Sequence, residues 1–83
     1  MLRNYKFKDA ENKNLYITLE SHYVKITDAK QTYLDSKQSG KKDDSILIGV
    51  GNGKEILSII TSGVDEAEKF ALDILNLCQT IKY

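Results

Sequence analysis

Residues 45–61, SILIGVGNGKEILSIIT, decide the fold that this chain is expected to adopt. Two apolar, largely β-branched runs flank the turn Gly51-Asn52-Gly53, and Asn-Gly supplies the positive φ values that the primed hairpin turns require. The segment therefore predicts an antiparallel β-hairpin. Because both runs are apolar on both faces, we expect both strands to lie in the interior of a sheet.

An amphipathic helix is predicted directly after the hairpin, over residues 62–82. Ser62 is placed to cap its first turn, with Asp65 three residues on as in a capping box. The apolar residues that follow recur at spacings of three and four and form one stripe. The stripe consists of Ala67, Phe70, Ala71, Ile74, Leu77, Cys78 and Ile81. We expect it to close the core against the sheet, while Leu72 and Leu75 beside it extend the apolar surface into an interface.

The residues before the hairpin predict further strands. Residues 15–20 alternate between apolar and polar side chains, which is typical of a half-buried strand. The alternation changes parity near Ser21-His22, and a period of two changes parity only at a turn or a bulge. Either a hairpin turn or a bent continuous strand therefore leads into a second extended piece at residues 23–27.

Three other stretches are polar or ambiguous. Residues 28–36 fit a helical turn or a short strand, and we favour the strand. Residues 36–44, SKQSGKKDD, are predicted to be an exposed, mobile loop with Gly40 as its pivot. Residues 1–14 are polar and charged and predict an N-terminal segment or an edge strand.

Together these elements predict one α+β domain over residues 1–83, because two cores would leave each half near the ~40 residues at which folds usually need disulfides or metals. We expect an antiparallel sheet of about five or six short strands, closed by the C-terminal amphipathic helix. A partly rolled barrel is one form of such a sheet. Residues 1–14 form the N-terminal segment, 15–61 the strands with the loop 36–44, and 62–82 the helix.

Composition narrows the classes of function. Twelve Lys and Arg balance twelve Asp and Glu, so no overall field draws the chain to nucleic acid or to an anionic membrane. A hydrophobic fraction of 41% without a long apolar run indicates a globular protein with no membrane span. One cysteine and no apolar leader predict a cytoplasmic location. The excess of Lys over Arg and the many Ile indicate AT-rich coding, as in a low-GC bacterium or its phage.

The sequence offers no set of residues for catalysis or for metal binding. The one histidine, His22, lies in the predicted turn, and Cys78 lies on the apolar stripe, where a thiol acts as a small hydrophobe. One His and one Cys are too few for zinc, and the acidic pairs lack the spacing of a calcium loop. The glycines of residues 49–53 lack the order of a phosphate-binding loop. We predict no catalytic, cofactor-binding or metal-binding residues, no small-molecule ligand and no enzyme activity.

The order of elements resembles that of the small bacterial pleckstrin-homology-like domains. The resemblance covers LYITLESHYVKITD (15–28), a polar loop, and a hairpin ending in IITSGVDEAEKFALDIL (59–75). The resemblance is seen most clearly at the start of the terminal helix, in Glu66, Ala67, Lys69, Phe70 and Ile74. The resemblance implies a partly rolled sheet capped at one end by the helix, serving as a binding or assembly scaffold, and it implies no ligand-binding residue.

Two functions follow as hypotheses. The first is a non-catalytic protein-interaction or regulatory and assembly module that binds a protein partner or itself, with Leu72 and Leu75 as its interface. The alternative is a nucleic-acid-binding accessory protein. Its contacts would be the basic and aromatic N-terminal residues Arg3, Tyr5, Lys6 and Lys8.

Overall fold

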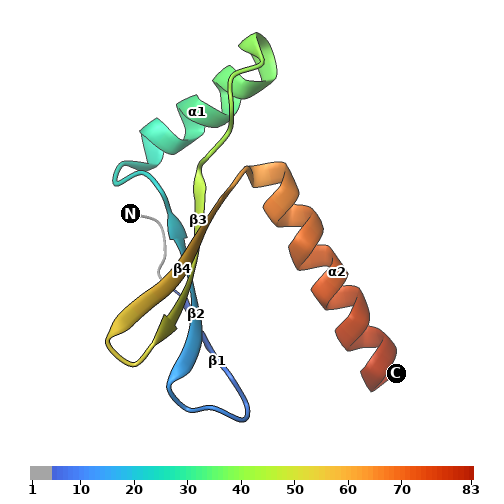
Figure 1. Ribbon diagram of the computed structural model, residues 1–83. Coiled ribbons are helices and arrows are strands. Elements are labelled where there is room, and N and C mark those ends of the chain that lie inside the picture. Colours follow the sequence, from blue (N-terminus) through green and yellow to red (C-terminus); the bar gives the residue numbers. More distant parts are fainter. Residues whose placement is uncertain (1–4) are drawn as a thin grey trace.

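The structure, a computed structural model, describes residues 5–83. Its elements in chain order are β1 (Tyr5–Lys8), β2 (Leu15–Ser21), α1 (Ile26–Ser39), β3 (Ile46–Asn52), β4 (Glu55–Ser62) and α2 (Val64–Lys82). The strands form one antiparallel sheet in the order β1-β2-β3-β4, with α1 at one end and α2 leading away from it (Figure 1). The α+β class is confirmed. The expected five or six strands and the rolled barrel are not, because residues 5–83 form four strands in an open sheet.

Helix α1 replaces the extended pieces that were predicted within residues 23–36, and those predictions are wrong. The parity change at the end of β2 is real, but there the chain leaves the sheet instead of continuing as a strand. Ile26, Ala29 and Tyr33 are spaced by three and four residues and turn toward the same pocket, as a helix places them. This spacing outweighs the β propensity of the Thr, Tyr and Leu at residues 32–34.

The predicted loop 36–44 is shorter than expected. Residues 36–39 form the last turn of α1, and Gly40 ends the helix with φ of 69°. This left-handed conformation is the common glycine C-cap, since a side chain there would be strained. The stretch without regular structure therefore covers residues 40–45.

The hairpin of β3 and β4 is confirmed, but its place in the sheet differs from the prediction. The turn lies further along the chain than predicted: Asn52 still belongs to β3, has no positive φ and pairs with Glu55. Gly53, with φ of 62°, begins the two-residue turn between them. β3 lies in the interior of the sheet, between β2 and β4. β4 lies at the edge, because the chain passes directly from it into α2 and no strand within residues 5–83 pairs with its outer side.

The strand register collects six apolar residues on one side of the sheet. Residues that face each other across antiparallel strands share a face, so the register gives two rows. The rows are Leu19, Ile48 and Ile60, and Phe7, Ile17 and Val50. We call these six residues the apolar sheet face. Phe7, Leu19 and Ile60 are exposed, so this face has no covering layer in the described chain.

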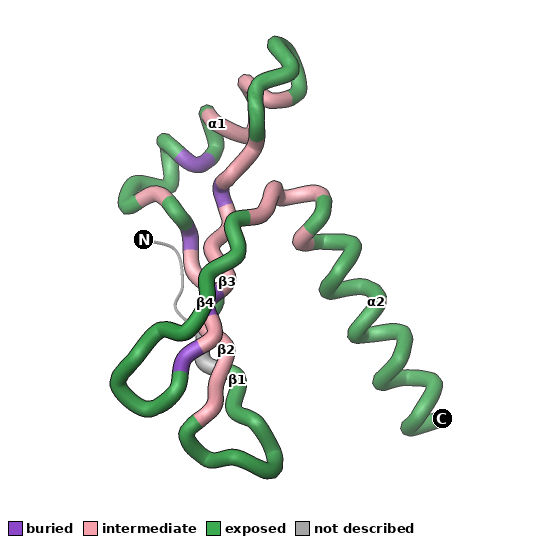
Figure 2. Tube along the Cα trace, in the orientation of Figure 1, coloured by how far each residue is buried: buried purple, intermediate pink, exposed green. Residues whose placement is uncertain are grey.

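The buried core is small and lies at the end of the sheet beside α1. Among residues with described side chains, Ala29 is the one buried hydrophobic residue, accompanied by the buried Ser21 and Ser45. Exposed residues run along β4 up to Thr61 and along nearly all of α2 (Figure 2). The described helix α2 has no buried residue, so the expectation that it closes the core is not met within one chain.

Candidate functional site

The Asp43 carboxylate anchors the start of α2. Its Oδ2 accepts a hydrogen bond from the Val64 backbone N–H at 2.8 Å. Its Oδ1 accepts from the Ser45 N–H at 3.1 Å and from the Ser45 hydroxyl at 2.7 Å. The Ser45 hydroxyl also lies 3.3 Å from the Ala29 carbonyl oxygen of α1. One carboxylate therefore joins the start of β3, the core below α1 and the first turn of α2.

Asp43 takes the role that was predicted for Ser62. Ser62 is still part of β4, where it pairs with Ile46, so the helix begins one residue later with Gly63 in the cap position. Partial burial opposes the charge of Asp43, but the hydrogen bonds from Val64 and Ser45 outweigh it and lower the pKa of the Asp43 carboxyl. The carboxylate is thus charged at neutral pH, which favours its place at a helix N-terminus.

A second contact ties the first turn of α2 to α1. The Lys37 ammonium forms an ion pair with Oδ2 of Asp65, and the Tyr33 hydroxyl donates to Oδ1 at 3.2 Å. The bond to Lys37 lowers the pKa of the Asp65 carboxyl, and the same bond raises the pKa of Lys37. The charge of Asp65 raises the pKa of Tyr33. These groups are half exposed, so they direct the helix more than they stabilise it.

Beyond its first turn, α2 presents its apolar residues to solvent. We call the predicted stripe, now placed on this helix, the α2 stripe; it consists of Ala67, Phe70, Ala71, Ile74, Leu77, Cys78 and Ile81. The large side chains Phe70, Ile74, Leu77 and Ile81 are all exposed. Leu75 borders the stripe and is 50% exposed, and Leu72, 57% exposed, lies roughly 160° from its centre at ~100° per residue. The apolar surface therefore reaches around most of the helix.

Strand β4 adds a second apolar surface. Ile56, Leu57, Ile59 and Ile60 are each more than half exposed. Leu57 falls at the register shift opposite Val50 and Gly51. A long apolar edge strand offers unpaired backbone groups and is usually blunted by charge or by proline, which β4 lacks within residues 56–60. Together, β4 and α2 form the candidate interaction surface.

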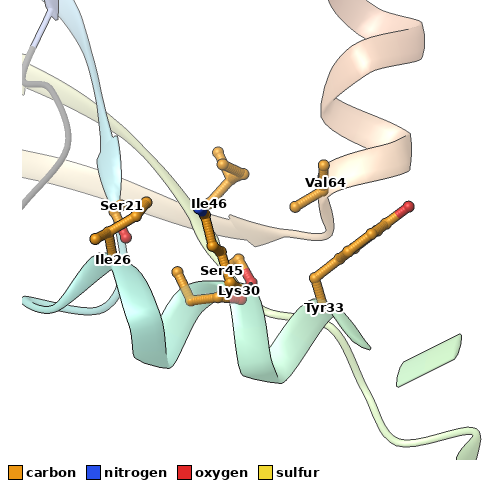
Figure 3. A pocket seen from close by; sticks show the side chains of 8 residues that line it. Ser21, Ile26, Lys30, Tyr33, Ser45, Ile46 and Val64 are labelled. Carbon is orange, nitrogen blue, oxygen red and sulfur yellow. Dashed lines mark hydrogen bonds between the residues drawn. The ribbon is translucent and has the colours of Figure 1, made fainter. Parts of the chain in front are cut away.

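A small pocket lies where α1 meets the starts of β3 and α2. It has a volume of about 200 Å³, below the ~300 Å³ at which small-molecule sites usually begin. Tyr33 extends from α1 toward the start of α2 and Val64 (Figure 3). The lining consists of Ser21, Ile26, Ala29, Lys30, Tyr33, Ser45, Ile46 and Val64. We regard this pocket as imperfect packing at the first turn of α2.

The residues with reactive side chains lie apart from one another. His22 is exposed after β2, and its ring meets that of Tyr23 edge-on at 5.0 Å. Cys78 is exposed on α2, because the stripe that was expected to bury it is not covered by any of residues 5–83. Over the described residues no three His, Cys, Asp or Glu side chains gather as metal ligands would.

The N-terminal residues of the nucleic-acid hypothesis are described only in part. Arg3 lies outside the described residues. The backbone places Tyr5 and Lys6 in β1, opposite Leu19 and Thr18. Lys8 is exposed at the end of the same strand. Nucleic-acid binding through these residues stays a prediction.

Sequence reasoning missed the residues that anchor α2. Asp43 was placed in a solvated loop, and Tyr33 in a strand, because both act through contacts with residues far along the chain. Only the spacing of Ile26, Ala29 and Tyr33 could have placed Tyr33 on a helix. No local pattern marks Asp43 as the anchor of a helix that starts 21 residues later.

Within the described residues no helix is long and apolar enough to cross a membrane. Comparison of the chain with protein-family models, with curated protein sequences and with solved structures found no match. The site is therefore interpreted from its own geometry.

Proposed function

We propose that this chain is a non-catalytic protein-interaction module that works through β4 and α2, with Leu75 at the border of the contact and Leu72 on the far side of α2. The observation that carries the proposal is that α2, described in full, has an apolar stripe and buries none of its residues. A helix of this kind is stable in water chiefly when its apolar side is packed. The surface therefore requires a protein partner.

The exposed hydrophobic residues are concentrated and not scattered. Of the sixteen large exposed hydrophobic residues in the described chain, ten lie on β4 and α2. Scattered apolar residues are normal on a protein surface, but a contiguous apolar patch of more than a few hundred Å² marks an interaction site. The concentration on two consecutive elements favours one continuous contact.

In this proposal the sheet is covered by a helix, as the sequence predicted, although the helix belongs to the complex and not to one chain alone. We infer that the sheet is covered by a helix only when the module has bound its partner, which is how the binding or assembly scaffold implied by the pleckstrin-homology-like resemblance would act here. We place the module in the cytoplasm of a bacterium or phage host, where a free exposed thiol such as Cys78 stays reduced.

The reactivity of Cys78 tests the proposal. Cys78 lies on the α2 stripe, and Asn76 lies roughly 160° away on the polar side at ~100° per residue. The natural chain and a variant with Cys78→Ser and Asn76→Cys would each be labelled with a maleimide, in buffer at high concentration and in extract of the native cell. We expect slow labelling of Cys78 under at least one of these conditions and fast labelling at position 76 under all of them.

Equally fast labelling at both positions in buffer and in extract would contradict the proposal, because the stripe would then be uncovered. Protection of Cys78 in a chain that sediments as a monomer in buffer would contradict it as well, because the helix would then be covered by its own sheet.

A further inference from the structure

We propose that the partner is a second copy of this chain, and that two copies exchange α2 so that each α2 stripe lies on the apolar sheet face of the other. The inference rests on the proposed function, since it names the partner of α2 and adds the apolar sheet face as the surface on which α2 packs. Four observations lead to it: the excess of exposed area, the shape of the chain, the match between its two apolar surfaces and the anchored root of α2.

The exposed area is too large for a folded monomer. The chain exposes 6800 Å², whereas a folded monomer of 9.4 kDa typically exposes about 5,000 Å². The excess is about 1,800 Å² per copy. Two copies that cover this excess would bury about 3,600 Å² in all, within the ~2,000 to 5,000 Å² of obligate homodimers. The unburied area is thus what a permanent dimer of this chain needs.

The shape points the same way. The radius of gyration is 14.7 Å, whereas a compact domain of this length has about 12 Å. The molecule measures 43 × 36 × 18 Å, so it is flat, as expected of a single sheet layer. Figure 1 shows the cause: α2 starts at the end of the sheet, turns back and runs beside it, diverging from it at an angle. A partner that lies in this angle would restore a two-layer domain.

The chain carries both halves of a matched contact. α2 has 19 residues and is therefore about 28 Å long, while the eight residues of β4 span about 26 Å. One helix can thus cover the length of the sheet. Because every copy offers one uncovered stripe and one uncovered sheet face, a two-fold exchange covers both in each copy, as an isologous interface requires.

The chemistry of both surfaces also fits a second copy. Neither the α2 stripe nor the apolar sheet face contains a charged residue, so a charged partner surface would lose its hydration without gaining a counter-charge. The chain has no net charge, so two copies approach each other without net repulsion. An apolar surface of matching length is what the partner must provide, and the chain itself provides it.

The root of α2 opposes the alternative in which the helix folds back on its own sheet. Gly63 alone separates β4 from α2, so the direction of the helix depends on its first turn. Val64 and Asp65 of that turn are held by Asp43, Tyr33 and Lys37. These contacts set the direction in which α2 leaves β4. The anchored root thus holds the helix outward, where a second copy reaches it.

Sedimentation equilibrium of the purified natural chain between 1 and 100 µM provides the first test. We expect a mass of twice 9.4 kDa in the upper part of this range. A mass of 9.4 kDa at 100 µM would overturn the inference. A mass well above that of a dimer would overturn it as well, because a two-fold exchange closes on itself.

The second test establishes which copy covers which surface and needs no variant that could fail to fold. A dimer mixed from ¹³C-labelled and unlabelled chains would be examined by isotope-filtered NMR. We expect intermolecular NOEs between the methyl groups of Ile74 or Leu77 and those of Ile48 or Ile60. Intermolecular NOEs restricted to β4 against β4, or to α2 against α2, would overturn the exchange.

Failure of the inference can be told from failure of the proposed function. A monomer in buffer whose Cys78 is protected only in cell extract would end the second-copy inference and leave a protein-interaction module with a different partner. A monomer whose Cys78 reacts fast under every condition would end both.

Discussion

The two helices of this chain differ in a way that runs against their composition. α1 is the more polar helix, yet it packs on the end of the sheet, buries Ala29 and lines a pocket with Ile26 and Tyr33. α2 carries the longer apolar stripe and buries nothing. If burial within the chain were the purpose of both helices, the opposite would be expected. The comparison favours our proposal that the apolar side of α2 contacts another molecule.

Within α2 itself, the first turn differs from the rest of the helix in the same way. Its first turn is held by polar bonds to Asp43 and to α1, whereas the rest of the helix is apolar and uncovered. In our proposal the polar bonds set the direction of the helix, and the apolar stripe supplies the affinity for the partner. Variants in the two parts should therefore have different effects, which the following predictions use.

The largest effect is expected from a charge in the middle of the α2 stripe. Ile74→Glu removes a large side chain that the proposed dimer would bury and places a carboxylate there, twice in a symmetric dimer. We expect dimer affinity to fall by about 1,000-fold or more. The matched control, Asn76→Glu, adds the same charge on the polar side and should change affinity less than about threefold. Analytical ultracentrifugation measures both, and equal effects would contradict a face-specific contact.

Smaller effects are expected at the border of the stripe. Leu75→Glu should weaken the dimer by about 10- to 100-fold, because only part of its side chain is covered by a partner on the stripe. Leu72→Glu, on the far side, should weaken it by less than about 10-fold. Isothermal dilution calorimetry measures the dimer affinity of each variant and so ranks their effects. If Leu72→Glu proved more harmful than Ile74→Glu, the contact would lie on the other side of α2.

The anchor of the helix root should contribute less than the stripe. Asp43→Asn keeps the shape of the side chain but removes its charge and one acceptor oxygen, so we expect a loss of about 1 kcal/mol in the free energy of unfolding. Amide exchange at Val64 should become faster, because its acceptor is weakened. Urea unfolding at one fixed chain concentration measures the free energy of unfolding, and NMR measures the amide exchange of Val64. The neighbouring variant Asp44→Asn should leave Val64 exchange unchanged.

The charge of Asp43 also predicts a pH dependence. Its pKa is lower in the folded chain than in the unfolded chain, so its contribution is complete above the unfolded value of about 3.9. It is lost as the pH falls through the lower folded value, where the folded carboxylate is protonated. Unfolding midpoints at several pH values should thus decline on acidification, less steeply in Asp43→Asn. Identical slopes would show that Asp43 is not the titrating group.

The smallest effect is expected from the ion pair between the two helices. Lys37→Ala removes the charge partner of Asp65, but both side chains are half exposed and solvent screens them. We expect only a slight loss of stability, which 0.5 M salt reproduces in the natural chain. Thermal unfolding monitored by circular dichroism compares this variant with Lys41→Ala in the loop. A loss as large as that of Asp43→Asn would mean that the ion pair anchors α2.

Local patterns predicted the elements that depend on local rules. The hairpin around Gly53, the strand at residues 15–20 and the long terminal helix all follow from spacing and turn chemistry, and all are present. α1 was mistaken for a strand because Thr32, Tyr33 and Leu34 suit a strand, although the wider spacing of Ile26, Ala29 and Tyr33 is helical. The β propensity of residues 32–34 was given more weight than the helical spacing of the apolar residues in 26–33.

The arrangement of the elements was beyond local patterns. Because both strands of the hairpin are apolar, β4 was predicted to lie in the interior of the sheet. Because α2 has an apolar stripe, it was predicted to pack on its own sheet. Both inferences assumed that every apolar surface is covered within one chain. The same patterns arise when a second chain covers them, and the sequence does not distinguish the two cases. Only the excess width at Leu72 and Leu75 pointed to an interface.

The central claim is that the chain buries enough apolar surface to be stable only when another copy covers α2. The most direct measurement is the urea midpoint of unfolding as a function of chain concentration. For a dimer that unfolds as it dissociates, each tenfold rise in concentration adds about 1.4 kcal/mol of stability, so the midpoint should rise steadily from 1 to 100 µM. A midpoint that stays constant over this range would contradict the claim.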